Sequence, residues 1–64
     1  MLVGQALKKA RESKGLTQKQ LADMLYVDTS LVCRWEKGQR KVPLVTAVVI
    51  LDILEMTLDD FKKM

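Results

Sequence analysis

The sequence has 64 residues and contains no histidine, one cysteine, one proline and only three aromatic residues. Without histidine, and with Cys33 as a lone thiol, a structural zinc site, an intrachain disulfide and histidine-based acid–base catalysis are excluded. No pairing of nucleophile and base remains, so we expect no enzyme, no cofactor and no metal. No apolar run is long enough to span a bilayer and the N-terminus lacks a signal-peptide pattern, which predicts a cytoplasmic protein with no membrane partner.

The residues that are present favour one compact helical domain over residues 1–64. Apolar residues make up 48% of the chain, which is enough for a small core. Charge is distributed unevenly: residues 1–41 hold nine cations and four acids, a net charge of +5, whereas residues 42–64 hold two cations and four acids, a net charge of −2. A basic end suits contact with a polyanion, although the same charges would also keep a small domain soluble.

Apolar spacing and helix-cap residues predict an all-α fold of five helices. Four β-branched residues would also suit a buried strand, namely Val45, Val48, Val49 and Ile50, but no second strand exists to pair with it. The expected helices span about 2–14, ended by Gly15; about 18–25, begun by a capping box of Thr17 and Gln20; about 28–37, begun by Asp28 and ended by Gly38; about 43–55, begun at Pro43; and a last helix capped by Thr57.

The helix expected at 28–37 has two different faces. Helical spacing puts Leu31, Val32 and Trp35 on one side. The other side is small, polar and basic and carries Thr29, Ser30, Cys33, Arg34 and Lys37. Short side chains with one long arginine suit a helix that enters the DNA major groove, and an ordinary solvated surface is the alternative interpretation.

Several residues at fixed spacing resemble one known family. They are Gly15-Leu16-Thr17-Gln18, Leu21-Ala22, Val27, Val32, Trp35-Glu36-Lys37-Gly38 and Pro43. Together they resemble the helix-turn-helix DNA-binding domain of the phage repressor and Cro class, the XRE family, over about residues 4–61. The resemblance implies a compact five-helix repressor-like fold in which the helix at 18–25 lies across the groove and the next helix enters it.

The resemblance also implies roles for individual residues. Base reading is expected from Thr29, Ser30, Cys33 and Arg34, and phosphate binding from Gln18, Lys19, Lys37, Arg40 and Lys41. Arg34 can bind a guanine bidentately, with a phosphate contact as the alternative. Arg11 and Glu36 are expected to form a structural salt bridge.

Two residues depart from the family pattern or invite a further role. Tyr26 stands where the tight turn usually carries glycine, so either Tyr26 adopts a left-handed conformation at a cost of about 1 kcal/mol or the turn differs and its ring packs on neighbouring helices. Oxidation of Cys33 would block the reading face, whereas an unoxidised Cys33 is simply a small residue that fits the groove.

The helix expected at 43–55 is apolar nearly all round, which predicts a homodimer. Its core stripe is expected to be Leu44, Ala47, Val48, Leu51 and Leu54. The dimer interface is expected to contain Val45, Val49, Ile50, Ile53 and Phe61. In the alternative, Leu58, Phe61 and Met64 fold back over the second stripe.

These features predict a sequence-specific transcriptional repressor of the Cro or repressor type. It would bind a palindromic operator in double-stranded DNA as a dimer, and a regulatory protein partner could control it. The alternative is a protein-interaction or antitoxin-like subunit with the same fold. Acidic residues on the face of the helix at 28–37 would favour that alternative, but the face carries Arg34 and Lys37.

Overall fold

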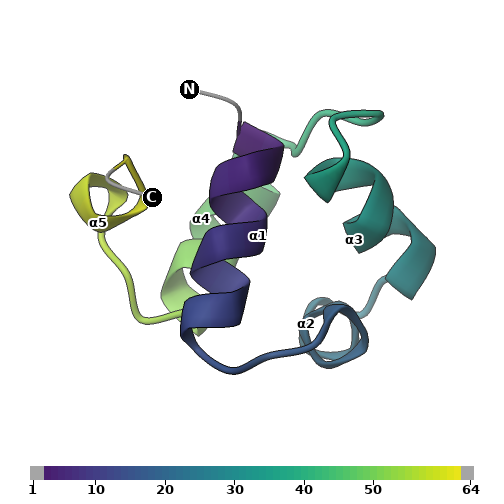
Figure 1. The fold of residues 1–64 in the computed structure, drawn as a ribbon, viewed down its shortest axis with the longest axis horizontal. Helices are drawn as coiled ribbons and strands as arrows, with labels where there is room; N and C mark the ends of the chain where they lie inside the picture. Colours follow the sequence, from purple (N-terminus) through teal and green to yellow (C-terminus); the bar gives the residue numbers. More distant parts are fainter. Residues whose placement is uncertain (1–2, 63–64) are drawn as a thin grey trace.

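The computed structural model describes residues 3–62, without the side chains of Val3, Leu58 and Lys62. The described residues form five α-helices and no strand, which confirms the all-α prediction. Helices α2 and α3 lie on one side of α1, and α5 lies on the other (Figure 1). The helices are α1 (Val3–Ser13), α2 (Gln18–Leu25), α3 (Thr29–Glu36), α4 (Leu44–Ile53) and α5 (Leu58–Lys62).

The expected cap residues set most of these boundaries. Thr17 Oγ1 accepts a hydrogen bond from Gln20 N at 3.0 Å, and Gln20 Oε1 accepts one from Thr17 N at 2.8 Å, so the predicted capping box is confirmed. Gly15 and Gly38 have φ of 72° and 76° and end α1 and α3 in the left-handed region, which favours glycine. Thr57 begins α5 and accepts a hydrogen bond from Asp60 N at 3.2 Å.

Asp28 occupies the N-cap position of α3 but does not act as a side-chain cap. Its backbone is extended, with φ −70° and ψ 144°, as an N-cap requires. Its side chain nevertheless makes no cap hydrogen bond. The position of Asp28 was therefore predicted correctly, whereas its capping bond is absent.

Tyr26 takes the left-handed conformation in the turn between α2 and α3. It has φ 58° and ψ 42°, and its N–H points back to the carbonyls of Ala22 and Asp23. The side chain is 95% exposed, so the ring does not pack on the neighbouring helices. Of the two alternatives, the strained left-handed turn is the one observed.

The core is built from α1, α2, α3 and α4, because each contributes side chains that are almost fully buried. Figure 1 shows α1 standing in front of α4, with α3 beside them. Leu16, Val27, Leu31 and Phe61 are partly buried against this core. The buried cluster consists of Leu7, Ala10, Leu21, Ala22, Val32, Trp35, Ile50 and Leu54.

Gly4 allows α1 to approach the C-terminal end of α3 closely. A Cβ atom at this position would clash with the carbonyl oxygen of Trp35 and would lie 2.8 Å from that of Glu36. Both obstacles are backbone atoms, which cannot rotate away. Only glycine fits here without moving one helix relative to the other.

The rotation of α4 about its axis differs from the prediction. Leu44 and Val48 were expected in the core, but they are 81% and 60% exposed. Ile50 was expected in a dimer interface, but it is 2% exposed and belongs to the core, and Ile53 and Phe61 also pack against the core.

The only acid in α4 is compatible with this rotation. Asp52 lies two residues from Ile50, about 200° round the helix, so burial of Ile50 directs Asp52 to solvent. Placing the carboxylate outside avoids burying an unpaired charge. The predicted fold-back of Leu58 and Met64 lies outside the side chains that the structure describes.

Candidate nucleic-acid interface

The outer face of α3 is open to solvent as the sequence predicted. Thr29, Ser30 and Arg34 are exposed, and Cys33 is partly buried between them. On the inner side, Val32 and Trp35 are buried in the core. The helix therefore presents short side chains and one long cation outward, while apolar packing of its inner side holds it on the domain.

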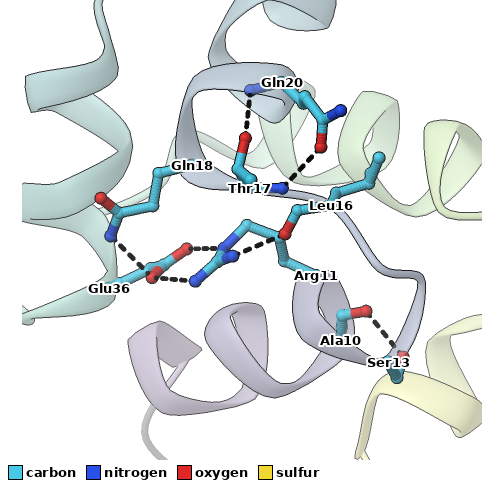
Figure 2. Close-up of polar contacts among 8 residues, drawn as sticks. All are labelled: Ala10, Arg11, Ser13, Leu16, Thr17, Gln18, Gln20 and Glu36. Atoms are coloured by element: carbon cyan, nitrogen blue, oxygen red, sulfur yellow. Dashed lines mark hydrogen bonds and ion pairs between the residues drawn. The ribbon is translucent and has the colours of Figure 1, made fainter.

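A buried ion pair fixes the C-terminal end of α3 to α1. Arg11 Nε lies 2.7 Å from Glu36 Oε2, and Arg11 Nη2 donates a hydrogen bond to Glu36 Oε1 at 3.2 Å (Figure 2). Arg11 Nη1 also donates to the carbonyl oxygen of Leu16 at 2.6 Å. The predicted salt bridge is present, and its hydrogen bond with Glu36 raises the pKa of Arg11.

Gln18 joins the same cluster from the first turn of α2. Its Nε2 donates a hydrogen bond to Glu36 Oε1 at 3.0 Å (Figure 2). The sequence predicted a phosphate contact for this side chain, and the structure shows it holding α2 against the end of α3. Its backbone N–H lies in the first turn of α2, where helical amides lack intrahelical partners. The contact of Gln18 with Glu36 was not predicted.

Exposed cations lie on α2 and on the loop after α3, the two segments that flank α3 along the chain. Lys37 follows α3 directly, and Arg40 and Lys41 lie in the loop that leads to α4. Lys19, on α2, forms an ion pair with Asp23 at 3.1 Å, with both side chains largely exposed. A surface pair of this kind contributes little, so it leaves Lys19 available to another anion.

An exposed acid also lies directly before the outer face of α3, and the sequence interpretation assigned it only a capping role. Asp28 is exposed and precedes Thr29 directly. A carboxylate there repels phosphate, but it can accept a hydrogen bond from the amino group of a cytosine. Because its side chain makes no cap hydrogen bond, the carboxylate is available for another contact. The sequence gives no indication of this, and only the structure does.

The outer face of α4 carries four adjacent aliphatic side chains, which we call the α4 apolar face. Leu44, Val45, Val48 and Val49 are 81%, 77%, 60% and 43% exposed. Val45 and Val49 were expected on an exposed stripe, whereas Leu44 and Val48 were missed. Aliphatic residues side by side on a surface mark a contact site more often than single ones do.

In the part of the chain that the structure describes, no group of three or more potential metal ligands occurs. No helix among the described residues is long and apolar enough to cross a membrane.

Comparison with known proteins agrees with this geometry. Residues 7–61 match a family model described as helix-turn-helix. The matched family is the Cro/C1 type, and the match covers most of the chain. A search of curated proteins gave no match.

Proposed function

The chain belongs to the Cro/C1-type helix-turn-helix family of DNA-binding domains and is not an enzyme, and from this premise we propose that it is a sequence-specific transcriptional repressor. It occupies a palindromic operator as a homodimer, in the cytoplasm, and needs no cofactor. The observation that carries the proposal is the exposed outer face of α3, with Arg34 in the last turn, on a helix fixed by a buried ion pair.

Sequence is read by α3 in the major groove. Thr29, Ser30 and Cys33 are small enough to let the helix backbone come close to the base edges. Arg34 reaches further, and its guanidinium binds O6 and N7 of a guanine with two hydrogen bonds. Such a pair discriminates against other bases by about 1–3 kcal/mol.

Phosphates on both sides of the groove hold α3 in register. At one side, the backbone N–H of Gln18 at the positive end of α2 and the ammonium group of Lys19 face the phosphates. At the other side, Lys37, Arg40 and Lys41 do so. Four cations per subunit give eight per dimer, which predicts a loss of about 10³- to 10⁵-fold in affinity between 50 and 200 mM salt.

Two copies are needed to read a palindrome. Half-sites one helical turn apart require two α3 helices separated by about 34 Å. One copy measures 27 × 21 × 21 Å, so two copies in contact span this distance. The α4 apolar face supports the dimer, and control of the repressor then comes from its concentration or from a partner protein.

Selection of random DNA duplexes tests the proposed function. The parent protein, Arg34→Ala and the control Lys14→Ala are each incubated with the duplexes at about 150 mM salt, and bound DNA is sequenced. We expect a palindromic motif for the parent and for Lys14→Ala. Arg34→Ala should lose preference at one symmetric pair of positions. General binding without an enriched motif would contradict the proposal.

The α4 apolar face also supports a second candidate function. The same fold can serve as an antitoxin-like subunit that binds a different protein through these aliphatic residues. In that case the parent protein enriches no motif, and Val48→Glu abolishes binding to the partner without changing the affinity for DNA.

A further inference from the structure

We propose that Asp28 is a specificity-determining residue whose carboxylate accepts a hydrogen bond from the amino group of a cytosine in the major groove. The inference rests on the proposed reading of DNA by α3 and names one base that is read there. Two observations on the protein carry it, together with the chemistry of the base edges.

The first observation is that Asp28 has no partner in the protein. The described chain has three acids between residues 17 and 41. Two of them, Asp23 and Glu36, form ion pairs with cations at 3.1 Å and 2.7 Å respectively. The exposed side chain of Asp28 makes neither an ion pair nor a cap hydrogen bond with any described residue. Its carboxylate therefore has its full capacity to accept hydrogen bonds from a ligand.

The second observation is the position of Asp28 at the N-terminal end of α3. Asp28 is the N-cap residue and precedes Thr29 directly. In a helix-turn-helix domain, the N-terminal residues of the second helix contact the base edges. The amide of Leu31, one of those that an N-cap side chain ordinarily binds, donates instead to the backbone carbonyl of Asp28 at 3.0 Å. The side chain can therefore turn to a base without opening the first turn of the helix.

The chemistry of DNA determines what this carboxylate can bind. Phosphates repel it, so an unpaired acid at the interface lowers the affinity unless it meets a hydrogen-bond donor. In the major groove the only donors are the amino groups of cytosine and adenine. Adenine carries the acceptor N7 beside its amino group, whereas guanine and thymine present acceptors at the corresponding edge. Cytosine is therefore the base that suits Asp28.

The same charge separates the operator from other DNA. On the operator, the cytosine amino group satisfies the carboxylate. On other sequences, the carboxylate faces acceptors and phosphates, which weakens binding. Because specificity is a difference between two affinities, Asp28 increases it from both sides. Removal of the carboxylate should consequently weaken binding to the operator and strengthen binding to unrelated DNA.

Selection of random duplexes at about 150 mM salt tests the base preference. Asp28→Ala should keep the rest of the palindrome and lose cytosine at one symmetric pair of positions. Asp28→Asn should exchange cytosine for adenine there, because an amide binds N6 and N7 of adenine together. Asp23→Asn is the matched control, since it makes the same charge change at an exposed position on α2, and it should keep the motif of the parent.

Titration with a chemically modified duplex tests the hydrogen bond itself. N4-methylcytosine still pairs with guanine but carries a methyl group in place of the N–H in the major groove. The parent should bind the modified operator about tenfold more weakly than the unmodified one. Asp28→Ala should bind both equally, and it should bind a duplex without the motif more tightly than the parent does. Asp23→Asn should bind the operator and the unrelated duplex more tightly, so only Asp28→Ala changes the two affinities in opposite directions.

Two results would overturn the inference alone: a parent motif that both Asp28 variants keep, or an equal loss on methylation in the parent and in Asp28→Ala. A parent protein that enriches no motif would overturn the proposed function and the inference together. Circular dichroism of each variant checks that it is folded, which we expect because the Asp28 side chain makes no cap hydrogen bond.

Discussion

Removal of Glu36 should destabilise the protein strongly, because it leaves a guanidinium buried without its carboxylate. The side chains of Arg11 and Glu36 are 9% and 3% exposed. In Glu36→Ala, Arg11 would retain its bond to the Leu16 carbonyl but lose both bonds to the carboxylate. Breaking a buried pair on one side costs about 3–5 kcal/mol.

The size of the chain makes this loss decisive. Domains have a free energy of unfolding of about 0.05–0.15 kcal/mol per residue, which gives about 3–10 kcal/mol for this chain. Glu36→Ala should therefore be unfolded in part or entirely at room temperature. Glu36→Gln should lose less, since its amide oxygen still accepts a bond from Arg11 and its volume is unchanged.

Urea unfolding followed by circular dichroism measures both losses. Asp23→Ala is the control, because it breaks the exposed pair with Lys19 and should change the free energy of unfolding by less than about 0.5 kcal/mol. A loss below about 1 kcal/mol in Glu36→Ala would refute the reasoning, because it would mean that water reaches Arg11 or that the helices shift to expose it.

The pair should also persist at alkaline pH. Its hydrogen bond with Glu36 raises the pKa of Arg11, so the stabilisation by Arg11 is fully present below the pKa of the unfolded chain. It is lost only when the pH rises through the higher pKa of the folded state. Titration to about pH 10 should therefore cause no loss of stability attributable to Arg11.

Three further predictions concern the backbone and the helix caps. Tyr26→Gly should stabilise the protein by about 0.5–1 kcal/mol, because it relieves left-handed strain, while the greater freedom of glycine in the unfolded chain offsets part of the gain. A lower urea midpoint would contradict this. Gly4→Ala should destabilise the protein by about 1–3 kcal/mol despite the better helix propensity of alanine, because the new Cβ meets the backbone of α3. An unchanged thermal midpoint would show that α1 can move away at no cost. Thr17→Ala should cost about 1 kcal/mol because it removes the capping bond, whereas Asp28→Ala should cost only a few tenths because no such bond exists; equal losses in urea would show that the two caps do not differ.

The parts of the fold that were predictable from sequence depend on local chemistry. A capping box or a helix-ending glycine acts within a single turn of the chain. The pattern alone therefore located the end of α1 at Gly15, the start of α2 at Thr17 and the end of α3 at Gly38. The Arg11–Glu36 pair spans 25 residues along the chain, and it was predicted because it is part of the family resemblance. The inner and outer faces of α3 were correct because polar and apolar residues alternate there at helical spacing.

The remaining features depend on contacts between distant segments. The close approach of Gly4 to the end of α3 leaves no pattern in the sequence, because a glycine near the start of a helix has many ordinary explanations. The same holds for the bond between Gln18 and Glu36, since an exposed glutamine at a helix start commonly faces solvent. The missing cap bond of Asp28 could not be read from a residue type that is favoured at N-caps.

Helix α4 shows why an apolar pattern can give the right helix and the wrong surface. Eight of its ten residues are apolar, and the exceptions are Thr46 and Asp52. Hydrophobicity therefore barely differs between its faces, and several rotations about the helix axis would bury a similar apolar area. The neighbouring helices select one rotation by accepting Ile50 and Leu54 into the core, and Asp52 is compatible with it because it then faces solvent. Once this rotation is fixed, Leu44, Val45, Val48 and Val49 must face outward. The surface available for a second copy is therefore a consequence of core packing, and a variant that rotates α4, such as Ile50→Asp, would change the fold and the association together.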